Sequence, residues 1–153
     1  MASKVKFKNF NEDYAGIILK YNTGSVRKYF MAFNTLEDVQ AWTKTTLEEI
    51  HAHRKQEFII LDQANEFVGM IAIWEKPDKV GEVSIWIKEP AQRAGYGKAA
   101  LKLLIDKHAQ KYRKLEYKVS EENQASANLA QSLGFKKSTK LHSSKELLFI
   151  RDL

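Results

Sequence analysis

The sequence contains no cysteine and only two prolines among its 153 residues. The absence of cysteine excludes disulfide bonds, thiolate metal ligands and a cysteine nucleophile, and it is compatible with a reducing compartment. The longest apolar-rich stretch, residues 67–74, is far too short to span a bilayer, and residues 1–10 lack the apolar core of a signal peptide. We therefore expect a cytoplasmic protein.

The chain also lacks the features of a disordered or fibrous protein. Hydrophobic residues make up 44% of the sequence and charged residues 29%, and no internal repeat or low-complexity tract is present. A chain of 153 residues is long enough to bury most of its apolar surface in one core. We expect a single domain over residues 1–153.

The net charge is +6, from 25 basic and 19 acidic residues. Such an excess suits nucleic acid, an acidic partner or a polyanionic cofactor. The lysines and arginines are scattered between carboxylates without a run of five or six, which argues against nucleic acid. The four histidines, His51, His53, His108 and His142, show no metal-binding spacing, so no metal site is expected.

Hydrophobic periodicity predicts alternating strands and helices. Strands are expected at 5–10, 56–62, 66–75, 80–89 and 115–120, with a closing hairpin of 135–141 and 145–153 around residues 142–144. Helices are expected from near Asn11, at 36–54 behind a capping box, at 97–112 and at 123–134, whereas residues 23–34 suit a loop or a short helix. The order predicts a mixed sheet with helices on both faces.

The loop at residues 90–97 is the first candidate binding site. A strand ends before it at Lys88 and a helix begins after it at Gly97, so unpaired N–H groups and the positive end of the helix dipole favour a phosphate or pyrophosphate. Arg93 and Lys98 add positive charge. The pattern is neither a P-loop nor a Rossmann fingerprint, because it lacks G-x-x-x-x-G-K-[ST] and the third glycine of G-x-G-x-x-G.

The motif from Gln92 to Gly97 resembles the Q/R-x-x-G-x-G/A signature of the GNAT superfamily of acyl-CoA N-acyltransferases. Asn123 to Ser126, followed by Leu133-Gly134-Phe135, is similar to the N-x-x-S and LGF segment of the RimJ/RimL branch, which acetylates ribosomal-protein N-termini. Residues 26–42 are similar to that branch as well. The resemblance covers essentially the whole chain in order.

The resemblance implies an α/β (α+β) fold, with a twisted, mostly antiparallel sheet of six or seven strands in which strands four and five splay apart. It also implies acetyl-CoA as cosubstrate. The pantetheine arm would follow Ile85, Trp86 and Ile87 and touch Asn123. The pyrophosphate would lie on the loop formed by Gln92, Arg93, Ala94, Gly95, Tyr96, Gly97 and Lys98.

The chemistry of acetyl transfer requires a base, because an amine is protonated near neutral pH and must lose a proton before it attacks a thioester. By resemblance Glu82 is the candidate base; the alternative is a solvent-facing strand residue paired with a lysine. Ala130 stands where many members carry the tyrosine that protonates the leaving thiolate. Ser126 is the candidate for that role and for a cofactor contact, and a helix-start serine bonded to backbone is the alternative.

The acceptor is not identified by the sequence. Tyr29, Phe30 and Trp74 are candidate substrate-binding residues, with core packing as the alternative. We expect an N-acetyltransferase that acts on a peptide N-terminus or a small-molecule amine, as a monomer or homodimer without nucleic-acid or membrane partners. A CoA-binding module without catalysis is the competing hypothesis.

Overall fold

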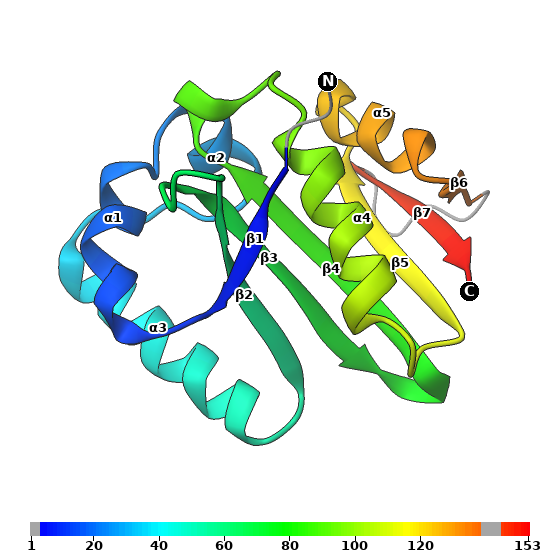
Figure 1. The fold of residues 1–153 in the computed structure, drawn as a ribbon, viewed down its shortest axis with the longest axis horizontal. Coiled ribbons are helices and arrows are strands. Elements are labelled where there is room, and N and C mark those ends of the chain that lie inside the picture. The colour runs from blue at the N-terminus through cyan, green and yellow to red at the C-terminus, as the bar shows by residue number, and fades with distance from the viewer. Residues whose placement is uncertain (1–3, 139–144) are drawn as a thin grey trace.

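The computed structural model describes residues 4–138 and 145–153 and places seven strands in one sheet (Figure 1). The strands are β1 (Lys6–Asn9), β2 (Lys55–Leu61), β3 (Phe67–Lys76), β4 (Val80–Ile87), β5 (Lys114–Ser120), β6 (Lys136–Lys137) and β7 (Glu146–Asp152). Their spatial order is β1-β2-β3-β4-β5-β7-β6, and only β4 and β5 pair in parallel. The sheet is therefore mixed and mostly antiparallel, as the sequence predicted.

Among the residues that the structure describes, five α-helices and three short 3₁₀ turns connect the strands. The helices are α1 (Ala15–Lys20), α2 (Gly24–Tyr29), α3 (Leu36–His51), α4 (Tyr96–His108) and α5 (Gln124–Ser132), and the turns are η1 (Glu12–Tyr14), η2 (Pro77–Lys79) and η3 (Glu89–Ala91). Within the described residues, no helix is long and apolar enough to cross a membrane.

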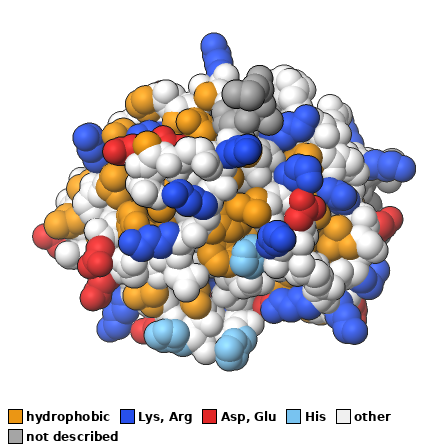
Figure 2. Space-filling view, in the orientation of Figure 1, with side chains coloured by type: hydrophobic (Ala, Val, Ile, Leu, Met, Phe, Trp, Pro, Cys, Tyr) orange, Lys and Arg blue, Asp and Glu red, His pale blue; other side chains and the backbone are white. Residues whose placement is uncertain are grey.

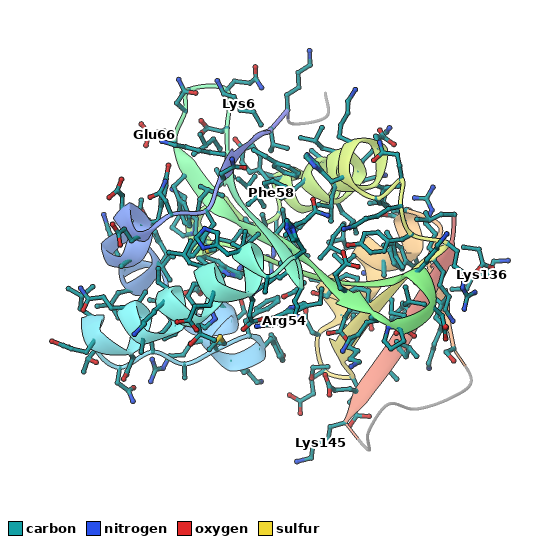
Figure 3. The ribbon with its side chains drawn as sticks, turned by 90° about the horizontal axis from the view of Figure 1, so that it is seen from below. Lys6, Arg54, Phe58, Glu66, Lys136 and Lys145 are labelled. Atoms are coloured by element: carbon teal, nitrogen blue, oxygen red, sulfur yellow. The ribbon has the colours of Figure 1, made fainter. Side chains whose placement is uncertain are left out.

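The helices cover both faces of the sheet, with α1 and α3 on one side and α4 on the other (Figure 3). Ile18 and Val39 pack with Ile59 and Met70 on the first face. Leu101, Leu104, Ala127 and Ala130 pack with the opposite face, which includes Ile71 and Val83. Phe58, labelled in Figure 3, belongs to this second face, where its ring lies 4.5 Å from that of His108. Strand alternation divides the apolar residues between two core layers.

The sheet opens between β4 and β5. The two strands pair only from Val80 opposite Lys114 to Val83 opposite Tyr117, while β4 continues to Ile87 and β5 to Ser120. The β5-facing edge of β4 after Val83 is therefore without a strand partner in the described part of the chain. This is the splay that the family resemblance implied.

Several helix limits differ from those predicted. Helix α3 ends at His51 rather than residue 54, because the chain turns through Ala52 and His53 takes a positive φ of 57°. Helix α4 begins one residue early and ends at His108 rather than 112, since Tyr112 lies in a turn whose N–H bonds to the Ala109 carbonyl. Residues 23–34 form the short helix α2 and a loop.

The caps and the closing strands follow the prediction more closely. Thr35 and Asp38 form the expected capping box, and Asn123 caps α5 by accepting from the Ser126 N–H at 3.3 Å. Gly134 has a φ of 83°, the left-handed conformation that ends a helix. Strand β7 lies between β5 and β6 and pairs antiparallel with both, whereas the predicted turn at 142–144 lies outside the described residues.

Candidate active site at the splay

A groove of about 650 Å³ runs past the start of α4 and the start of α5. It collects every predicted cofactor contact except Ala94: Ile85, Trp86, Ile87, Gln92, Arg93, Gly95, Tyr96, Gly97, Lys98, Asn123 and Ser126 line it. Residues from two distant parts of the sequence, 85–98 and 122–132, thus face one ligand-sized space. We call this space the cofactor groove.

The loop before α4 presents main-chain donors to the cofactor groove. Arg93 and Gly95 have φ values of 64° and 85°, left-handed conformations of the kind that turn N–H groups inward in anion-binding loops. The amides of Tyr96, Gly97 and Lys98 form the first turn of α4, where intrahelical acceptors are absent. The loop can therefore cradle a phosphate with backbone donors and the helix dipole.

The Gln92 side chain holds this loop instead of pointing free donors at a ligand. Its Nε2 donates to the Ile87 carbonyl at 2.8 Å and to the Ser25 hydroxyl at 3.0 Å. The backbone N–H of Gln92 donates to the Glu89 carbonyl at 3.1 Å. Thr23 also donates to the Glu89 carboxylate at 2.5 Å. Hydrogen bonds therefore connect the loop before α4 to α2 and its N-cap.

A second cavity, of about 300 Å³, lies on the sheet face that carries α1 and α3. We call it the acceptor cavity. The predicted substrate residues Tyr29, Phe30 and Trp74 line it together with Glu82. Its other walls are Ile18, Asn22, Val26, Met31, Phe33, Trp42, Lys55, Glu57, Met70, Ala72, Val83, Ser84, Trp86, Tyr117, Lys118 and Glu146.

The two spaces meet at the splay. Tyr29, Phe30, Trp86 and Tyr117 line both the cofactor groove and the acceptor cavity. Because β4 and β5 separate after Val83 and Tyr117, a ligand on one face can reach a ligand on the other without crossing a hydrogen-bonded ladder. The two spaces are therefore connected through the sheet at this junction.

A hydrogen-bonded hub orders the loop that forms one wall of the acceptor cavity. Asn22 donates to the Met31 carbonyl at 2.7 Å and accepts from the Phe33 N–H at 2.8 Å. Arg27 donates to the Phe33 carbonyl and to Asn34 Oδ1, both at 2.5 Å. These contacts fix the position of residues 30–34, which belong to no helix or strand.

Glu82 faces the acceptor cavity with 19% of its side chain exposed. The Lys118 Nζ lies 2.6 Å from its Oε1 atom and the Lys76 Nζ lies 4.0 Å away. The contact with Lys118 is an ion pair without good hydrogen-bond geometry, since the same Oε1 is buried without a hydrogen-bond partner among the described residues. Glu82 therefore pairs with a lysine, as one alternative predicted, and also lines the cavity, as the role of a base would require.

The hydroxyl of Tyr117 is buried at the junction. It makes no well-directed hydrogen bond within residues 4–138 and 145–153, although Ser126 is close enough to influence it. Burial raises the pKa of the Tyr117 phenol to about 12, and the Ser126 side chain offsets part of that rise. The phenol therefore keeps its proton at neutral pH.

Sequence reasoning did not single out Tyr117, Lys55, Glu57 or Lys118. Alternation along β5 already indicated that Leu115, Tyr117 and Val119 share the buried face. In β2, Lys55 and Glu57 stand two residues apart beside the apolar run 58–61, which marks a charged pair on one strand face. Which face opens into a cavity depends on α2 and the 30–34 loop, and no local pattern gives that.

The surface charge is spread rather than gathered. On the face drawn in Figure 2, Lys and Arg side chains are dispersed and Asp and Glu lie among them. No three His, Asp or Glu side chains of the described residues are grouped so that they could hold a metal ion.

Comparison with protein families agrees with this geometry. Residues 5–136 match the family described as acetyltransferase (GNAT) domain, which is most of the chain. The chain belongs to the GNAT acetyltransferase family. Comparison with curated protein sequences gave no significant match.

Solved structures of other GNAT proteins share the fold at low sequence identity. RimL, a ribosomal-protein α-N-acetyltransferase in complex with coenzyme A, has a TM-score of 0.89 at 15% identity over 99% of this chain and 96% of its own. Mycobacterium smegmatis RimJ, with CoA-disulfide, has a TM-score of 0.84 at 16% identity over 97% and 81%. Vibrio cholerae spermidine N-acetyltransferase, with CoA and spermine, has a TM-score of 0.83 at 13% identity over 97% and 95%.

Proposed function

We propose that this GNAT domain, acting as one unit over residues 1–153, transfers the acetyl group of acetyl-CoA to a primary amine. The acceptor is a peptide or protein N-terminus or a small-molecule amine. The observation that carries the proposal is the junction at the splay, where the cofactor groove and the acceptor cavity meet between a carboxylate and a buried hydroxyl. The cytoplasmic location expected from the sequence stays a prediction.

The residues of the cofactor groove fit a CoA thioester. The amides at the start of α4, with Arg93 and Lys98, suit the pyrophosphate. The edge of β4 after Val83 has no strand partner and suits the pantetheine amides, although the Gln92 side chain already occupies the Ile87 carbonyl. Asn123 uses its oxygen to cap α5 and keeps its amide donors for a ligand. When bound, acetyl-CoA supplies the activated acetyl group.

Glu82 is the proposed base. It lies on β4 beside the splay. The buried carboxylate of Glu57 is farther away, because Glu57 of β2 lies opposite Ala72 of β3, which in turn lies opposite Ser84 of β4. Two strand spacings, about 10 Å, therefore separate Glu57 from β4. An ammonium that enters the acceptor cavity competes with Lys118 for the Glu82 carboxylate. Glu82 then takes the proton directly or through a water molecule.

Tyr117 and Ser126 are the proposed proton donors at the thiolate position. Ala130 removes the tyrosine that many family members use, and the buried phenol of Tyr117 stands at the junction with its proton retained. In this proposal a backbone N–H of β4 polarises the thioester carbonyl. The chain's own residues thus supply proton removal on one face and proton donation on the other.

A kinetic panel tests the proposal. CoA release is measured with acetyl-CoA and a series of primary amines and short peptides, and acetyl-CoA binding is measured in parallel by calorimetry. We expect turnover with at least one acceptor. Binding of acetyl-CoA without turnover on any acceptor, unchanged by Glu82→Gln, would support the inactive CoA-binding module instead.

The role of Tyr117 has its own test. Tyr117→Phe removes only the hydroxyl, and we expect kcat to fall by about 10-fold to 100-fold with little change in acetyl-CoA affinity. Ser126→Ala is the parallel variant. A fall in kcat would support Ser126 as a proton donor, whereas a kcat near the wild-type value would show that the serine only starts α5. Full activity of the Tyr117→Phe variant would remove the phenol from the mechanism.

A further inference from the structure

A buried ion pair lies in the acceptor cavity, away from the proposed chemistry. Lys55 and Glu57 stand two residues apart on β2 and face the same side, with 4% and 6% of their side chains exposed. The Lys55 Nζ lies 2.8 Å from the Glu57 Oε1, and both residues line the acceptor cavity. Lysine and glutamate side chains are almost never buried this deeply unless they are paired, and this pair lies where a ligand of the cavity would meet it.

Two indole rings complete the surroundings of the Lys55 ammonium. Its Nζ lies 4.1 Å from the ring centre of Trp74 and 5.6 Å from that of Trp42. A carboxylate beside aromatic faces is the arrangement by which proteins recognise an alkylammonium ligand. We call the space between the Glu57 carboxylate and the rings of Trp42 and Trp74 the cation subsite. In this protein the ammonium of Lys55 occupies it.

The other carboxylates near the cavity do not replace this subsite. Glu82 is already paired with Lys118 at 2.6 Å. Glu146 begins β7, opposite Ser120, across the sheet from β2. Burial and the charge of Glu49 in α3 raise the pKa of the Glu57 carboxyl, whereas the charge of Lys55 lowers it.

We propose that Lys55 is a specificity-determining residue that fills the cation subsite of the acceptor cavity with its own ammonium. The cavity then accepts amines whose only cationic group is the one to be acetylated, and it rejects diamines and polyamines. This inference rests on the proposed function, because it concerns the acceptor of that reaction.

The physical reason is charge repulsion in a place with little water. A diamine that places its reactive amine at the splay carries its second ammonium toward Lys55, and two like charges close together in a buried site disfavour binding by at least about tenfold. An acceptor with an apolar or carbonyl-bearing tail meets no such opposition. Lys55 thereby excludes acceptors that carry a second ammonium and makes no contact with the reacting amine.

The test compares n-butylamine with 1,4-diaminobutane, which have the same carbon chain and differ by one ammonium. Binding is measured by calorimetry and by intrinsic tryptophan fluorescence, since all three tryptophans line the cavity, and turnover is measured by CoA release. We expect the wild-type protein to prefer butylamine at least about tenfold. In Lys55→Met, which keeps the length and apolar contacts of the side chain, the diamine should gain at least about tenfold relative to butylamine.

Two further variants keep the test sharp. Lys55→Met/Glu57→Gln removes both charges of the pair, so it should keep the gain for the diamine that comes from the lost repulsion and lose only the part that attraction to the Glu57 carboxylate adds. Lys8→Met removes an exposed lysine that lies 5.6 Å from the Tyr14 ring outside both cavities, and it should keep the wild-type preference. Circular dichroism establishes that each variant is folded.

The outcomes separate this inference from the proposed function. If no amine is turned over, the acetyltransferase proposal fails, yet diamine binding to Lys55→Met still reports on the cation subsite. Equal affinity of the wild-type protein for the two amines would overturn the inference without any variant. An unchanged ratio in a folded Lys55→Met variant would overturn it as well.

Discussion

The cofactor groove presents mainly backbone groups to its ligand, whereas the acceptor cavity presents side chains from helices, loops and five strands. The loop before α4 needs only left-handed residues such as Gly95 and a helix start. The cavity needs the Asn22–Arg27 hub, the aromatic walls and two buried or half-buried ion pairs to coexist. A site made of main chain leaves a short sequence motif, and a site made of scattered side chains does not.

The comparison implies that variants of the acceptor cavity change kcat or the acceptor KM, whereas variants of the cofactor groove change the acetyl-CoA Kd. The largest effect should come from Glu82→Gln, which we expect to lower kcat by about 100-fold or more while the acetyl-CoA Kd stays near its wild-type value. Steady-state kinetics and calorimetry measure the two constants. Glu116→Gln is the matched control, since Glu116 lies opposite Glu82 in the β4–β5 register and lines neither space. Similar kcat values for the two variants would contradict the assignment of the base.

On the groove side, Gly95→Val should raise the acetyl-CoA Kd by about tenfold or more. A β-branched residue is strained at the φ of 85° that Gly95 adopts, and Gly95 lines the groove proposed for the phosphate. Gly97→Ala should have little effect, because the added Cβ meets Leu129 at 3.5 Å and Ile87 at 3.8 Å, which are ordinary contacts. Calorimetry compares the two variants, and equal affinities would show that the left-handed loop is not the phosphate site.

A smaller effect is expected at the wall of the cavity. Arg27→Ala removes the donors that hold the Phe33 carbonyl and Asn34, so the acceptor KM should rise by about tenfold while acetyl-CoA binding is kept. Arg27→Lys should recover only part of the loss, because an ammonium lacks the planar fork. An acceptor KM that does not change on Arg27→Ala would show that the 30–34 loop forms no part of the site.

The buried pair also makes stability depend on pH. Burial raises the pKa of the Glu57 carboxyl to about 7 despite the opposing charge of Lys55, above the unfolded value of 4.5. A raised folded pKa means that stability is highest when the carboxyl is protonated and declines as pH rises from about 4.5 through 7, by roughly 3 kcal/mol at most. Relative to Glu57→Gln, the wild-type free energy of unfolding in urea should therefore decline over that range. Parallel pH profiles of the two proteins would contradict this account.

Sequence patterns were sufficient for the order of strands and helices along the chain and for both capping motifs, because each depends on neighbours within a few positions. Asn123 and Gly134, for example, act on the helix that lies between them. The cofactor contacts came from the family resemblance and stay a prediction, although all of them but Ala94 line one groove. The end of α3 was misplaced because helical periodicity continues past His51 although the backbone does not.

The acceptor side could be predicted only in part. Tyr29, Phe30 and Trp74 were identified as candidates, but Lys55 and Glu57 were not, since their meaning depends on Trp42 of α3 and Trp74 of β3 closing around them. Tyr117 was missed for the same reason. Its importance comes from the point where β4 and β5 cease to pair, which tertiary structure determines.

The central claim is that the cosubstrate and the acceptor approach from opposite faces of the sheet and meet at the splay. A crystal structure of the wild-type protein with CoA tests it most directly. We predict the pyrophosphate against the backbone of residues 93–98, the pantetheine along Ser84 to Ile87, and the sulfur at the junction beside Tyr117. A loop closed against phosphate, or a sulfur that does not reach the acceptor cavity, would contradict the account.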